Sequence, residues 1–377
     1  MPSSPLRLLV AAGGTGGHVL PAVAVIDELK SRGVQLEVLW IGSRNGVERD
    51  IARSHDIPFI PIQTGKLRRY LSLETVTDMF RLPVGLAQAW TRVRRFRPDI
   101  IFSTGGNVSV PTVIAGARIA PILTHEQTAQ VGIANKISAR FAACFAASYE
   151  ETAQIARGYH KNVVVTGNPV RATLAKGKPE AAWETFGFTP DLPVIFVTGG
   201  ARGASAINQR IERLLPSLLD RAQVVHQAGP SSANDDAARL AKLRESWPEE
   251  IRKRYVVREF LGPELSDLYA IADLVIGRAG AGTVAELAFL GKPSILMPLP
   301  GTWGDEQRKN AAVLARAGAT IIVEQEETPA EALGKHIEEL LADPARRQDM
   351  AACAAGLARP DAAARLADEL LSLAGKR

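Results

Sequence analysis

The sequence predicts an α/β protein of two Rossmann-like, doubly wound parallel-sheet domains in tandem, on three observations. Short apolar runs alternate with stretches of helical periodicity along the chain. A glycine-rich turn of the form GGxxG follows an apolar run twice, at Gly13–Gly17 and at Gly199–Gly203. The length of 377 residues is also more than twice that of a typical domain of ~150 residues. The sequence therefore predicts two domains of the same fold class, one after the other.

The first half follows a strand–helix–strand rhythm. Leu6–Ala12 is expected to be a buried strand, and Val19–Arg32 a helix that ends near Gly33 because its apolar residues recur at helical spacing. Further strands are expected at Leu36–Ile41, Asp99–Ser103, Ala120–Thr124 and Val163–Thr166. This alternation is typical of a parallel sheet with helices on both faces.

The second half starts the same pattern again, with a strand expected at Val194–Thr198 and a helix at Ser205–Leu219. The linker is placed near Gly167-Asn168-Pro169, which predicts domains at residues 1–166 and 167–354. A last helix, about Asp361–Ala374 within residues 355–377, is a candidate to pack back on the first domain.

Composition excludes several classes of protein. A hydrophobic content of 46% and a charged content of 23% exclude disorder and coiled coil as the main architecture. Two distant cysteines, Cys144 and Cys353, exclude a disulfide-rich scaffold and favour a reducing compartment. Glycines, Asn107 and Pro111 interrupt the longest uncharged stretch, Ile100–Ala117, so no transmembrane helix is expected. The first residues hold only a very short apolar run before Gly13, so no secretory signal is expected.

Four glycine loops follow predicted strands, at Gly13–Gly17, Gly105-Gly106, Gly199–Gly203 and Gly277–Gly282. Such loops let backbone N–H groups approach a phosphate at a helix N-terminus, although tight turns also favour glycine. None is a Walker A loop or a GxGxxG motif with a following acid, so ATPase and NAD chemistry are disfavoured. No Asp-x-Asp motif lies near a strand end, so a leaving diphosphate would be stabilised without a metal, and no cofactor is expected.

Several polar residues are candidates for chemistry. His18 directly follows the first glycine loop and is either a general base or a capping or core histidine. Glu126, within His125-Glu126-Gln127, ends a predicted strand, where α/β folds place ligand groups. This segment is not HExxH, so zinc is not expected. Glu286 fits either a carboxylate that binds a ribose diol or the acid of a capping box that starts at Thr283.

The segment Gly65–Arg97 carries eight basic and two acidic side chains, interleaved with apolar ones. We interpret it as a patch that binds an anionic membrane surface, and not nucleic acid; the alternative is an ordinary helix with a solvated basic face. The candidate patch residues are Arg68, Arg69, Phe80, Leu86, Trp90, Arg92, Arg94 and Arg95.

Together these segments resemble the MurG family of bacterial N-acetylglucosaminyltransferases, in order and over essentially the whole chain. The matching motifs are GGTGGHVLPAVAV (Gly13–Val25), TGGNVSVP (Thr104–Pro111), HEQ…GIANK (His125–Lys136), GNPVR (Gly167–Arg171), TGGARGA (Thr198–Ala204), HQAG (His226–Gly229), EFL (Glu259–Leu261), RAGAGTVAELAFLGKPSILMP (Arg278–Pro298) and DEQRKNA (Asp305–Ala311). The resemblance implies a GT-B fold, with two domains facing a cleft. It implies inverting transfer of GlcNAc from UDP-GlcNAc to the muramyl C4 hydroxyl of undecaprenyl-linked lipid I, which gives lipid II and UDP.

The resemblance also implies residue roles and a location at the cytoplasmic face of the cell membrane. His18 and Glu126 would be catalytic. The donor would be bound by Thr15, Gly16, Gly17, Thr128, Arg171, Gly200, Ala201, Arg202, Gly203, Leu261, Arg278, Gly280, Ala281, Gly282, Thr283, Glu286 and Gln307. The acceptor would be bound by Gly14, Thr104, Gly105, Gly106, Asn107 and His125. The residues usual in the family are replaced at Asn107, Thr128, Ala201, Arg202 and Ala279.

Three alternatives stay open: a GT-B glycosyltransferase with another glycolipid or small-molecule acceptor, a UDP-GlcNAc 2-epimerase, and a non-catalytic UDP-sugar-binding module. The basic segment discriminates between them, because a lipid acceptor requires a membrane-binding surface and an epimerase or a soluble sensor does not.

Overall fold

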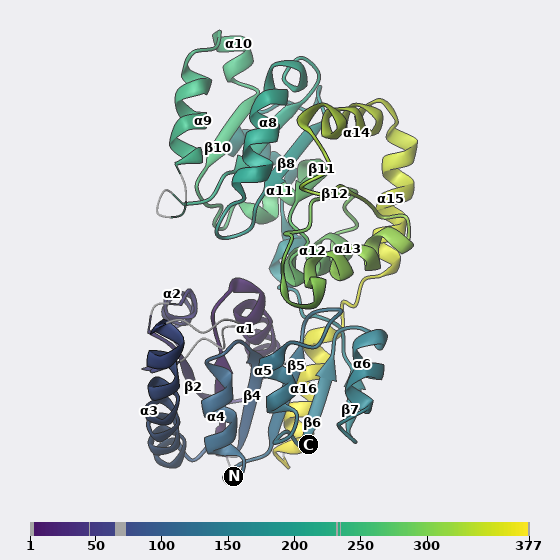
Figure 1. Cartoon of the computed structure of the whole chain (residues 1–377). Coiled ribbons are helices and arrows are strands. Elements are labelled where there is room, and N and C mark those ends of the chain that lie inside the picture. The colour runs from purple at the N-terminus through teal and green to yellow at the C-terminus, as the bar shows by residue number, and fades with distance from the viewer. Residues whose placement is uncertain (1–3, 45, 65–72, 231–232, 234, 376–377) are drawn as a thin grey trace. The chain divides into compact units, whose positions relative to one another are not determined.

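The computed structural model describes residues 4–44, 46–64, 73–230, 233 and 235–375. The chain divides into two compact units. Unit 1 comprises Met1–Arg171 together with Arg359–Arg377, and unit 2 comprises Ala172–Ala358. Each unit is built around one parallel sheet with helices on both faces (Figure 1).

The sheet of unit 1 has seven parallel strands in the order β3-β2-β1-β4-β5-β6-β7. Along the chain these strands are β1 (Leu6–Ala12), β2 (Leu36–Ser43), β3 (Phe59–Ile62), β4 (Ile100–Gly105), β5 (Ile122–Glu126), β6 (Cys144–Ala147) and β7 (Val163–Val165). The helices are α1 (Gly16–Ser31), α2 (Glu48–Ser54), α3 (Leu73–Phe96), α4 (Ser109–Gly116), α5 (Ile133–Ser138), α6 (Glu150–Arg157) and α16 (Ala362–Leu373).

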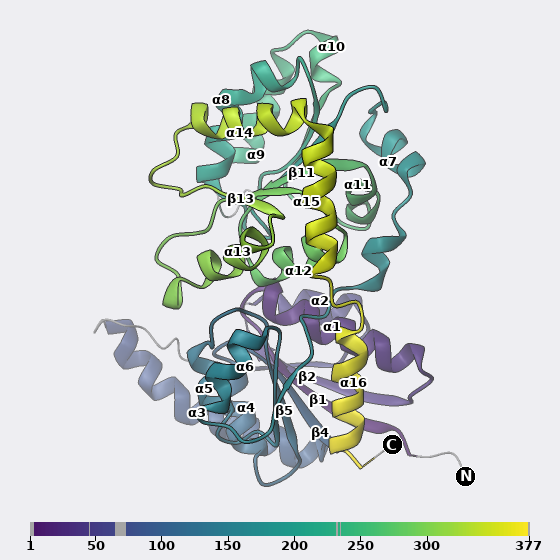
Figure 2. The same ribbon diagram turned by 90° about the vertical axis from the view of Figure 1, so that its right-hand side faces the viewer.

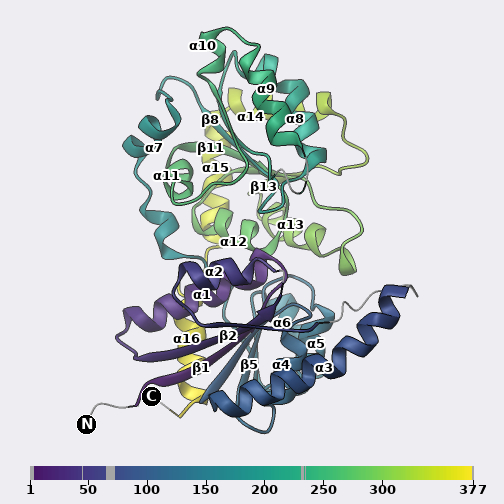
Figure 3. The same ribbon diagram turned by 90° about the vertical axis from the view of Figure 1, so that its left-hand side faces the viewer.

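Side chains that alternate along β1 separate the two faces of this sheet. Leu8 and Val10 pack with α1 and α16, whereas Leu9 and Ala11 pack with α3 and α4. The last helix, α16, contributes Leu366 and Leu370 to the same buried cluster as α1, and Figure 2 shows it lying along that face. The opposite face is covered by α3, α4 and α5, which Figure 3 shows on the other side of the sheet from α1 and α16.

The sheet of unit 2 has six parallel strands in the order β10-β9-β8-β11-β12-β13. These strands are β8 (Val194–Thr198), β9 (Gln223–Gln227), β10 (Tyr255–Arg258), β11 (Ala272–Gly277), β12 (Ser294–Leu296) and β13 (Thr320–Ile322). The helices are α7 (Pro179–Phe186), α8 (Ser205–Leu218), α9 (Asp236–Glu245), α10 (Glu249–Arg252), α11 (Leu265–Ile271), α12 (Ala281–Phe289), α13 (Glu306–Arg316), α14 (Ala330–Ala342) and α15 (Pro344–Gly356).

The predicted fold class is confirmed, because both sheets are parallel and carry helices on both faces. Each predicted strand overlaps an observed one, and the bounds of β1 and β8 are those expected. The strands β3 and β6 of unit 1 and β9, β10, β12 and β13 of unit 2 were not predicted. Over the part of the chain described here, no helix has both the length and the apolar character needed to cross a membrane.

Candidate functional site

The candidate site of unit 1 lies at the carboxyl ends of β1, β4 and β5. These strands are neighbours in a parallel sheet, so the loops that follow them meet at one edge. The loops are in direct contact, because a Cβ on Gly106 would lie 2.0 Å from the carbonyl oxygen of Gly13. Gly14 and Gly106 both have positive φ, of 100° and 83°, which a residue with a side chain rarely adopts. Glycine is therefore required here by the close approach of two turns.

His18 stands in the first turn of α1 and is half-buried. Its Nδ1 lies 3.2 Å from the carbonyl oxygen of Thr104 and 3.1 Å from Oε1 of Gln127. Since a carbonyl oxygen only accepts hydrogen bonds, Nδ1 carries the proton and Nε2 keeps its lone pair. The Thr104 hydroxyl donates to the carbonyl oxygen of His18 at 2.5 Å, which also fixes the backbone. These contacts fix the orientation of the ring and leave Nε2 as the nitrogen that faces neither Thr104 nor Gln127.

Gln127 connects His18 to a second, fully buried histidine. Its Nε2 lies 2.8 Å from the carbonyl oxygen of Thr104 and 3.1 Å from Nδ1 of His125. His125 has an exposed fraction of 0%, and its Nε2 lies 3.0 Å from the carbonyl oxygen of Gly167. His125 is thus enclosed, and its ring contacts Gln127, the Ser148 hydroxyl and the carbonyl oxygen of Gly167.

Glu126 is buried and its carboxylate is surrounded by donors. Oε1 accepts from the backbone N–H and hydroxyl of Thr128 at 3.2 and 2.9 Å. Oε2 accepts from the backbone N–H of Gly132 at 2.8 Å and from Nδ2 of Asn135 at 3.0 Å. These contacts let Glu126 hold the loop between β5 and α5 around His18. Thr128 is itself nearly buried, at 5% exposed.

Glu48 is a site residue that sequence reasoning missed. Its carboxylate, 0% exposed, accepts from the N–H of Gly14 at 3.1 Å and from the N–H of Ser43 at 2.7 Å. A Cβ on Gly13, Gly42 or Gly46 would collide with the Glu48 side chain. The N–H of Gly14 is therefore occupied by a residue of the chain itself. The signal available in the sequence was the group of glycines before Glu48, which leaves room for its side chain.

The remaining acceptor candidates differ in exposure. Thr104 and Gly105 are buried at the end of β4, whereas Gly106 is half-buried and Asn107 is exposed. Three of the residues predicted to bind the donor also lie in this unit: Thr15 is exposed, and Gly16 and Gly17 are half-buried at the start of α1. No side chain caps the N-terminus of α1, where the N–H of His18 donates to the carbonyl oxygen of Thr15 at 3.1 Å.

Two buried histidines, His125 and His226, should make the stability of the protein sensitive to acid. Burial lowers the pKa of His125 to about 4 and that of His226, in β9, to about 3. The unfolded chain, with a histidine pKa of ~6.5, therefore binds protons first as the pH falls. Their stabilising contribution is full above pH ~6.5 and declines as the pH falls towards about 4 for His125 and about 3 for His226, with a loss of about 2 kcal/mol per histidine at pH 5. Urea midpoints at pH 7 and pH 5 measure this loss. A His125→Gln variant should show a smaller change between the two pH values than the parent chain; an equal change would contradict the assignment.

The candidate site of unit 2 lies at the carboxyl ends of β8 and β11. Gly200 and Gly203 have positive φ, of 76° and 70°, and the Gly200 N–H donates to the Thr198 hydroxyl at 3.0 Å. Ala201 and Arg202 are exposed at the tip of the loop. A Cβ on Gly203 would lie 2.1 Å from the carbonyl oxygen of Ala228, so this loop packs directly on the end of β9.

Arg278 belongs to the glycine loop Gly277–Gly282 and is nearly buried. Its Nη1 donates to the carbonyl oxygens of Met297 and Pro298 at 3.0 and 3.2 Å, and its Nη2 donates to Oε1 of Gln325 at 2.6 Å. Burial lowers its pKa to about 10, which leaves it charged at neutral pH. Arg278 therefore holds the chain that follows β12.

Glu286 lies inside α12, which begins at Ala281, before Thr283. The interpretation of Thr283–Glu286 as a capping box is therefore wrong, since Glu286 is a full turn beyond the helix start. The carboxylate is half-buried and Oε2 accepts from the Tyr269 hydroxyl at 3.1 Å. Gly280, Gly282 and Thr283 are half-buried near it, and Ala281 is buried.

Three further donor candidates are dispersed over neighbouring loops. Leu261 is buried in the loop after β10. Gln307 is the second residue of α13, and its Oε1 accepts from the N–H of Leu299 at 3.0 Å, so it shapes the loop before that helix. Arg171 is half-buried at the end of the first segment of unit 1.

The described part of the basic segment is an exposed helix surface. On α3, Leu86 and Trp90 are 36% and 49% exposed, and Arg92, Arg94 and Arg95 are exposed beside them. The guanidinium of Arg94 lies 4.6 Å from the ring centre of Trp90. Arg68 and Arg69 and the side chain of Phe80 lie outside the described residues.

The described ranges hold no cluster of three or more His, Cys, Asp or Glu side chains arranged to hold a metal ion. The positive groups found at the glycine loops are helix N-termini and arginines.

Two family models match the chain: the glycosyltransferase family 28 N-terminal domain over residues 8–147 and the glycosyltransferase family 28 C-terminal domain over residues 194–366. A relative from Bacillus thuringiensis is 37% identical over 337 residues, covering 89% of this chain and 91% of the relative. It is named UDP-N-acetylglucosamine–N-acetylmuramyl-(pentapeptide) pyrophosphoryl-undecaprenol N-acetylglucosamine transferase 3.

Two solved structures extend the comparison. MurG of Acinetobacter baumannii aligns with a TM-score of 0.72 at 27% identity, covering 98% of this chain and 100% of that one. UDP-GlcNAc 2-epimerase of Neisseria meningitidis aligns with a TM-score of 0.68 at 16% identity, covering 97% of this chain and 100% of that one. The second likeness concerns the fold alone.

Two parallel-sheet units with glycine loops at their strand ends, matched by both family 28 domains, define a glycosyltransferase of the GT-B fold. The chain belongs to the MurG family of N-acetylglucosaminyltransferases within glycosyltransferase family 28.

Proposed function

We propose that this chain transfers N-acetylglucosamine from UDP-GlcNAc to the muramyl C4 hydroxyl of undecaprenyl-linked lipid I, giving lipid II and UDP. The observation that carries the proposal is the 37% identity over 89% of the chain to a relative named for this reaction. The local geometry supports it, because both pairs of glycine loops form the turns that phosphate chemistry needs.

On the acceptor side, His18 is the proposed general base. The carbonyl oxygen of Thr104 holds the proton on Nδ1, so Nε2 accepts the proton of the muramyl hydroxyl. As that oxygen bonds to the anomeric carbon of GlcNAc, the bond from this carbon to the phosphate oxygen breaks and UDP leaves with the electron pair. His18 then releases its proton to water. Glu126 is proposed to act through the β5–α5 loop, which it holds in place.

On the donor side, charge on the departing diphosphate is proposed to be stabilised by backbone N–H groups and arginines, without a metal. The groups proposed to act here are the Gly199–Gly203 loop, the N-termini of α8 and α12, Arg171 and Arg202. Glu286 would accept hydrogen bonds from the ribose hydroxyls, the backbone of Leu261 would bind uracil, and Gln307 would bind the sugar.

A membrane role for α3 is part of the proposal. Cytoplasmic leaflets are negatively charged, and each Lys or Arg near such a surface contributes ~1 kcal/mol to binding. The exposed arginines Arg92, Arg94 and Arg95 would supply attraction, and Leu86 and Trp90 would insert shallowly. The chain would then act as a peripheral protein at the cytoplasmic face of the membrane.

Charge reversal tests this surface. We expect the chain to sediment with anionic vesicles in a salt-sensitive way, and a variant with Arg92, Arg94 and Arg95 each replaced by Glu to lose that binding. The same variant should lose activity on long-chain lipid I in vesicles but keep activity on a water-soluble short-chain analogue. Glutamate at Arg221, Lys242 and Lys335, exposed on unit 2, makes the same change of net charge and should leave vesicle binding intact. Equal losses on both acceptors would contradict a membrane role.

The proposed reaction is tested by UDP release with a short-chain lipid I analogue, in EDTA. We expect release to require both the analogue and UDP-GlcNAc, and the analogue to gain one N-acetylhexosamine in mass. UDP release without the analogue, together with a 2-epimerised sugar, would establish the epimerase alternative. Binding of UDP-GlcNAc without turnover would establish the non-catalytic one. Activity lost in EDTA and restored by Mg²⁺ would contradict stabilisation of the leaving group without a metal.

A further inference from the structure

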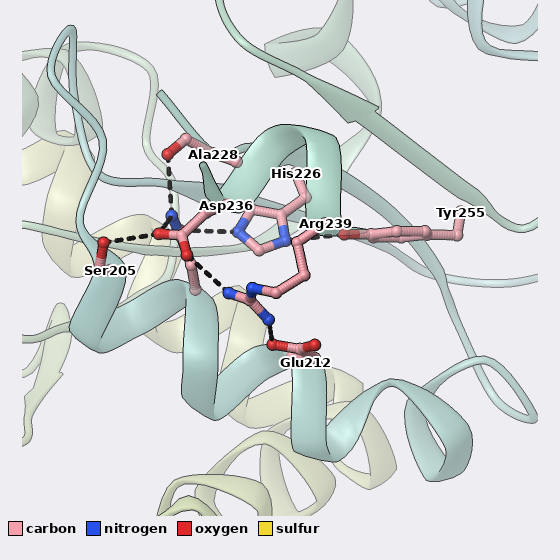
Figure 4. A network of polar contacts seen from close by, with 8 residues as sticks. Ser205, Glu212, His226, Ala228, Asp236, Arg239 and Tyr255 are labelled. Atoms are coloured by element: carbon pink, nitrogen blue, oxygen red, sulfur yellow. Dashed lines mark hydrogen bonds and ion pairs between the residues drawn. The ribbon is translucent and has the colours of Figure 1, made fainter. Parts of the chain in front are cut away.

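A buried chain of hydrogen bonds in unit 2 joins four secondary-structure elements (Figure 4). The Tyr255 hydroxyl, on β10, lies 3.0 Å from Nδ1 of His226, on β9. Nε2 of His226 lies 2.9 Å from Oδ1 of Asn208, on α8. Nδ2 of Asn208 donates to Oδ2 of Asp236, on α9, at 2.8 Å. The chain of contacts therefore runs from β10 to α9 through the beginning of α8.

Each group in this series of hydrogen bonds is defined as a donor or an acceptor. Nδ2 of Asn208 also donates to the carbonyl oxygen of Ala228 at 2.8 Å, which leaves Oδ1 as the acceptor that faces His226. Nε2 of His226 therefore carries the proton, and Nδ1 accepts from Tyr255. Tyr255, His226 and Asn208 are all 0% exposed, so water does not compete for these bonds. The order of donors and acceptors fixes the Asn208 side chain in one orientation.

Asp236 is the last residue in this series of hydrogen bonds, and its carboxylate binds side chains at the beginning of α8. Its carboxylate is 6% exposed and accepts from the Ser205 hydroxyl at 2.6 Å as well as from Asn208. Its other oxygen accepts from Nη2 of Arg239 at 2.6 Å, and Arg239 also pairs with Glu212. Arg239 is thus shared between two carboxylates, those of Asp236 and Glu212. Asp236 ties the beginning of α8 to α9 through Ser205 and Asn208.

The groups that Asp236 holds lie directly beside the glycine loop. Ser205 is the first residue of α8 and Asn208 is the fourth. The loop Gly199–Gly203 precedes them, and Gly203 packs on Ala228, whose carbonyl oxygen Asn208 also binds. The network therefore sets the position of the α8 N-terminus and of the loop relative to the sheet.

We propose that Asp236 is a positioning residue for the donor diphosphate. Through Ser205 and Asn208 it holds the first turn of α8 and the Gly199–Gly203 loop where their N–H groups meet the diphosphate. Asp236 does not itself touch the ligand. This inference rests on the proposed function, because it assumes that the loop binds the diphosphate of a UDP-sugar.

The test compares the affinities of UDP and uridine by calorimetry, since only UDP carries the diphosphate. Asp236→Asn keeps the shape of the side chain but replaces an acceptor oxygen with an N–H₂ donor that faces other donors. We expect UDP affinity to fall by about tenfold, with uridine affinity unchanged. Ser205→Ala removes one of the contacts and should give a smaller fall in the same direction. If Asp236→Asn does not fold, the Ser205→Ala variant alone tests the positioning role.

Gln223→Ala is the matched control. Gln223 is 3% exposed at the opposite end of β9, where it binds the backbone of Thr189 and Leu192. Its loss should lower stability without changing the ratio of UDP to uridine affinity. An unchanged ratio in Asp236→Asn and Ser205→Ala would overturn the positioning role of Asp236. If the parent chain itself bound UDP no more tightly than uridine, the proposed diphosphate site would fail instead.

Discussion

Replacement of His18 by alanine is expected to lower kcat by about 10²–10⁴-fold, the usual contribution of a general base. The structure gives the reason, because Thr104 holds the proton on Nδ1 and leaves Nε2 to accept the proton of the acceptor hydroxyl. UDP affinity should stay within about threefold of the parent value, since His18 belongs to unit 1 and the proposed nucleotide contacts lie largely in unit 2. Single-turnover kinetics and calorimetry measure the two effects separately.

His160→Ala is the control for this variant. His160 is also half-buried in unit 1, and its Nε2 lies 3.1 Å from the carbonyl oxygen of Ala142. Ala142 precedes β6, so this contact lies at the amino ends of the strands, away from the site at their carboxyl ends. The control should keep kcat close to the parent value. A His18→Ala variant that kept more than about a third of the parent kcat would show that His18 is not the base.

Replacement of Glu286 by alanine is expected to weaken UDP binding by at least about tenfold. Charge-assisted hydrogen bonds from two ribose hydroxyls are worth roughly 1.5–3 kcal/mol in total, and ~1.4 kcal/mol corresponds to a factor of ten. The fold should tolerate the change, because the side chain is half-buried on α12 and does not cap the helix.

Two comparisons make the Glu286 result specific. Binding of 2′-deoxyuridine diphosphate, which lacks one ribose hydroxyl, should be weakened less by Glu286→Ala than binding of UDP. Tyr269→Phe removes the hydroxyl that donates to Glu286 and keeps the carboxylate, so it should affect UDP binding much less. Unchanged UDP affinity in Glu286→Ala would mean that the carboxylate does not bind the ribose.

The long apolar strands and the glycine loops were predictable from the sequence, because burial on both faces of a parallel sheet leaves continuous apolar runs. The bounds of β1 and β8 follow from that pattern alone. The four-residue strands β3 and β6 were not found. Runs such as Phe59–Ile62 are too short to be distinguished from loop, and pairing with neighbouring strands is what makes them strands.

The candidate site was predictable only where its signal is local. His18 stands next to its glycine loop, so position along the chain was enough to select it. Glu48 reaches Gly14 across more than thirty residues, and only the fold shows that contact. The buried surroundings of Glu126 and His125 are likewise properties of packing. The capping-box pattern at Thr283 and Glu286 was misleading, because α12 begins before the threonine.

The most direct test of the proposed transfer is the structure of the new glycosidic bond. UDP-GlcNAc labelled with ¹³C at the anomeric carbon is incubated with the chain and a short-chain lipid I analogue, and the product is examined by NMR. The proposed attack by a hydroxyl that His18 deprotonates inverts the donor's α configuration. We therefore expect a β-linked GlcNAc on the muramyl C4 oxygen. A retained α linkage, a bond to another oxygen, or label found only in free N-acetylmannosamine would contradict it.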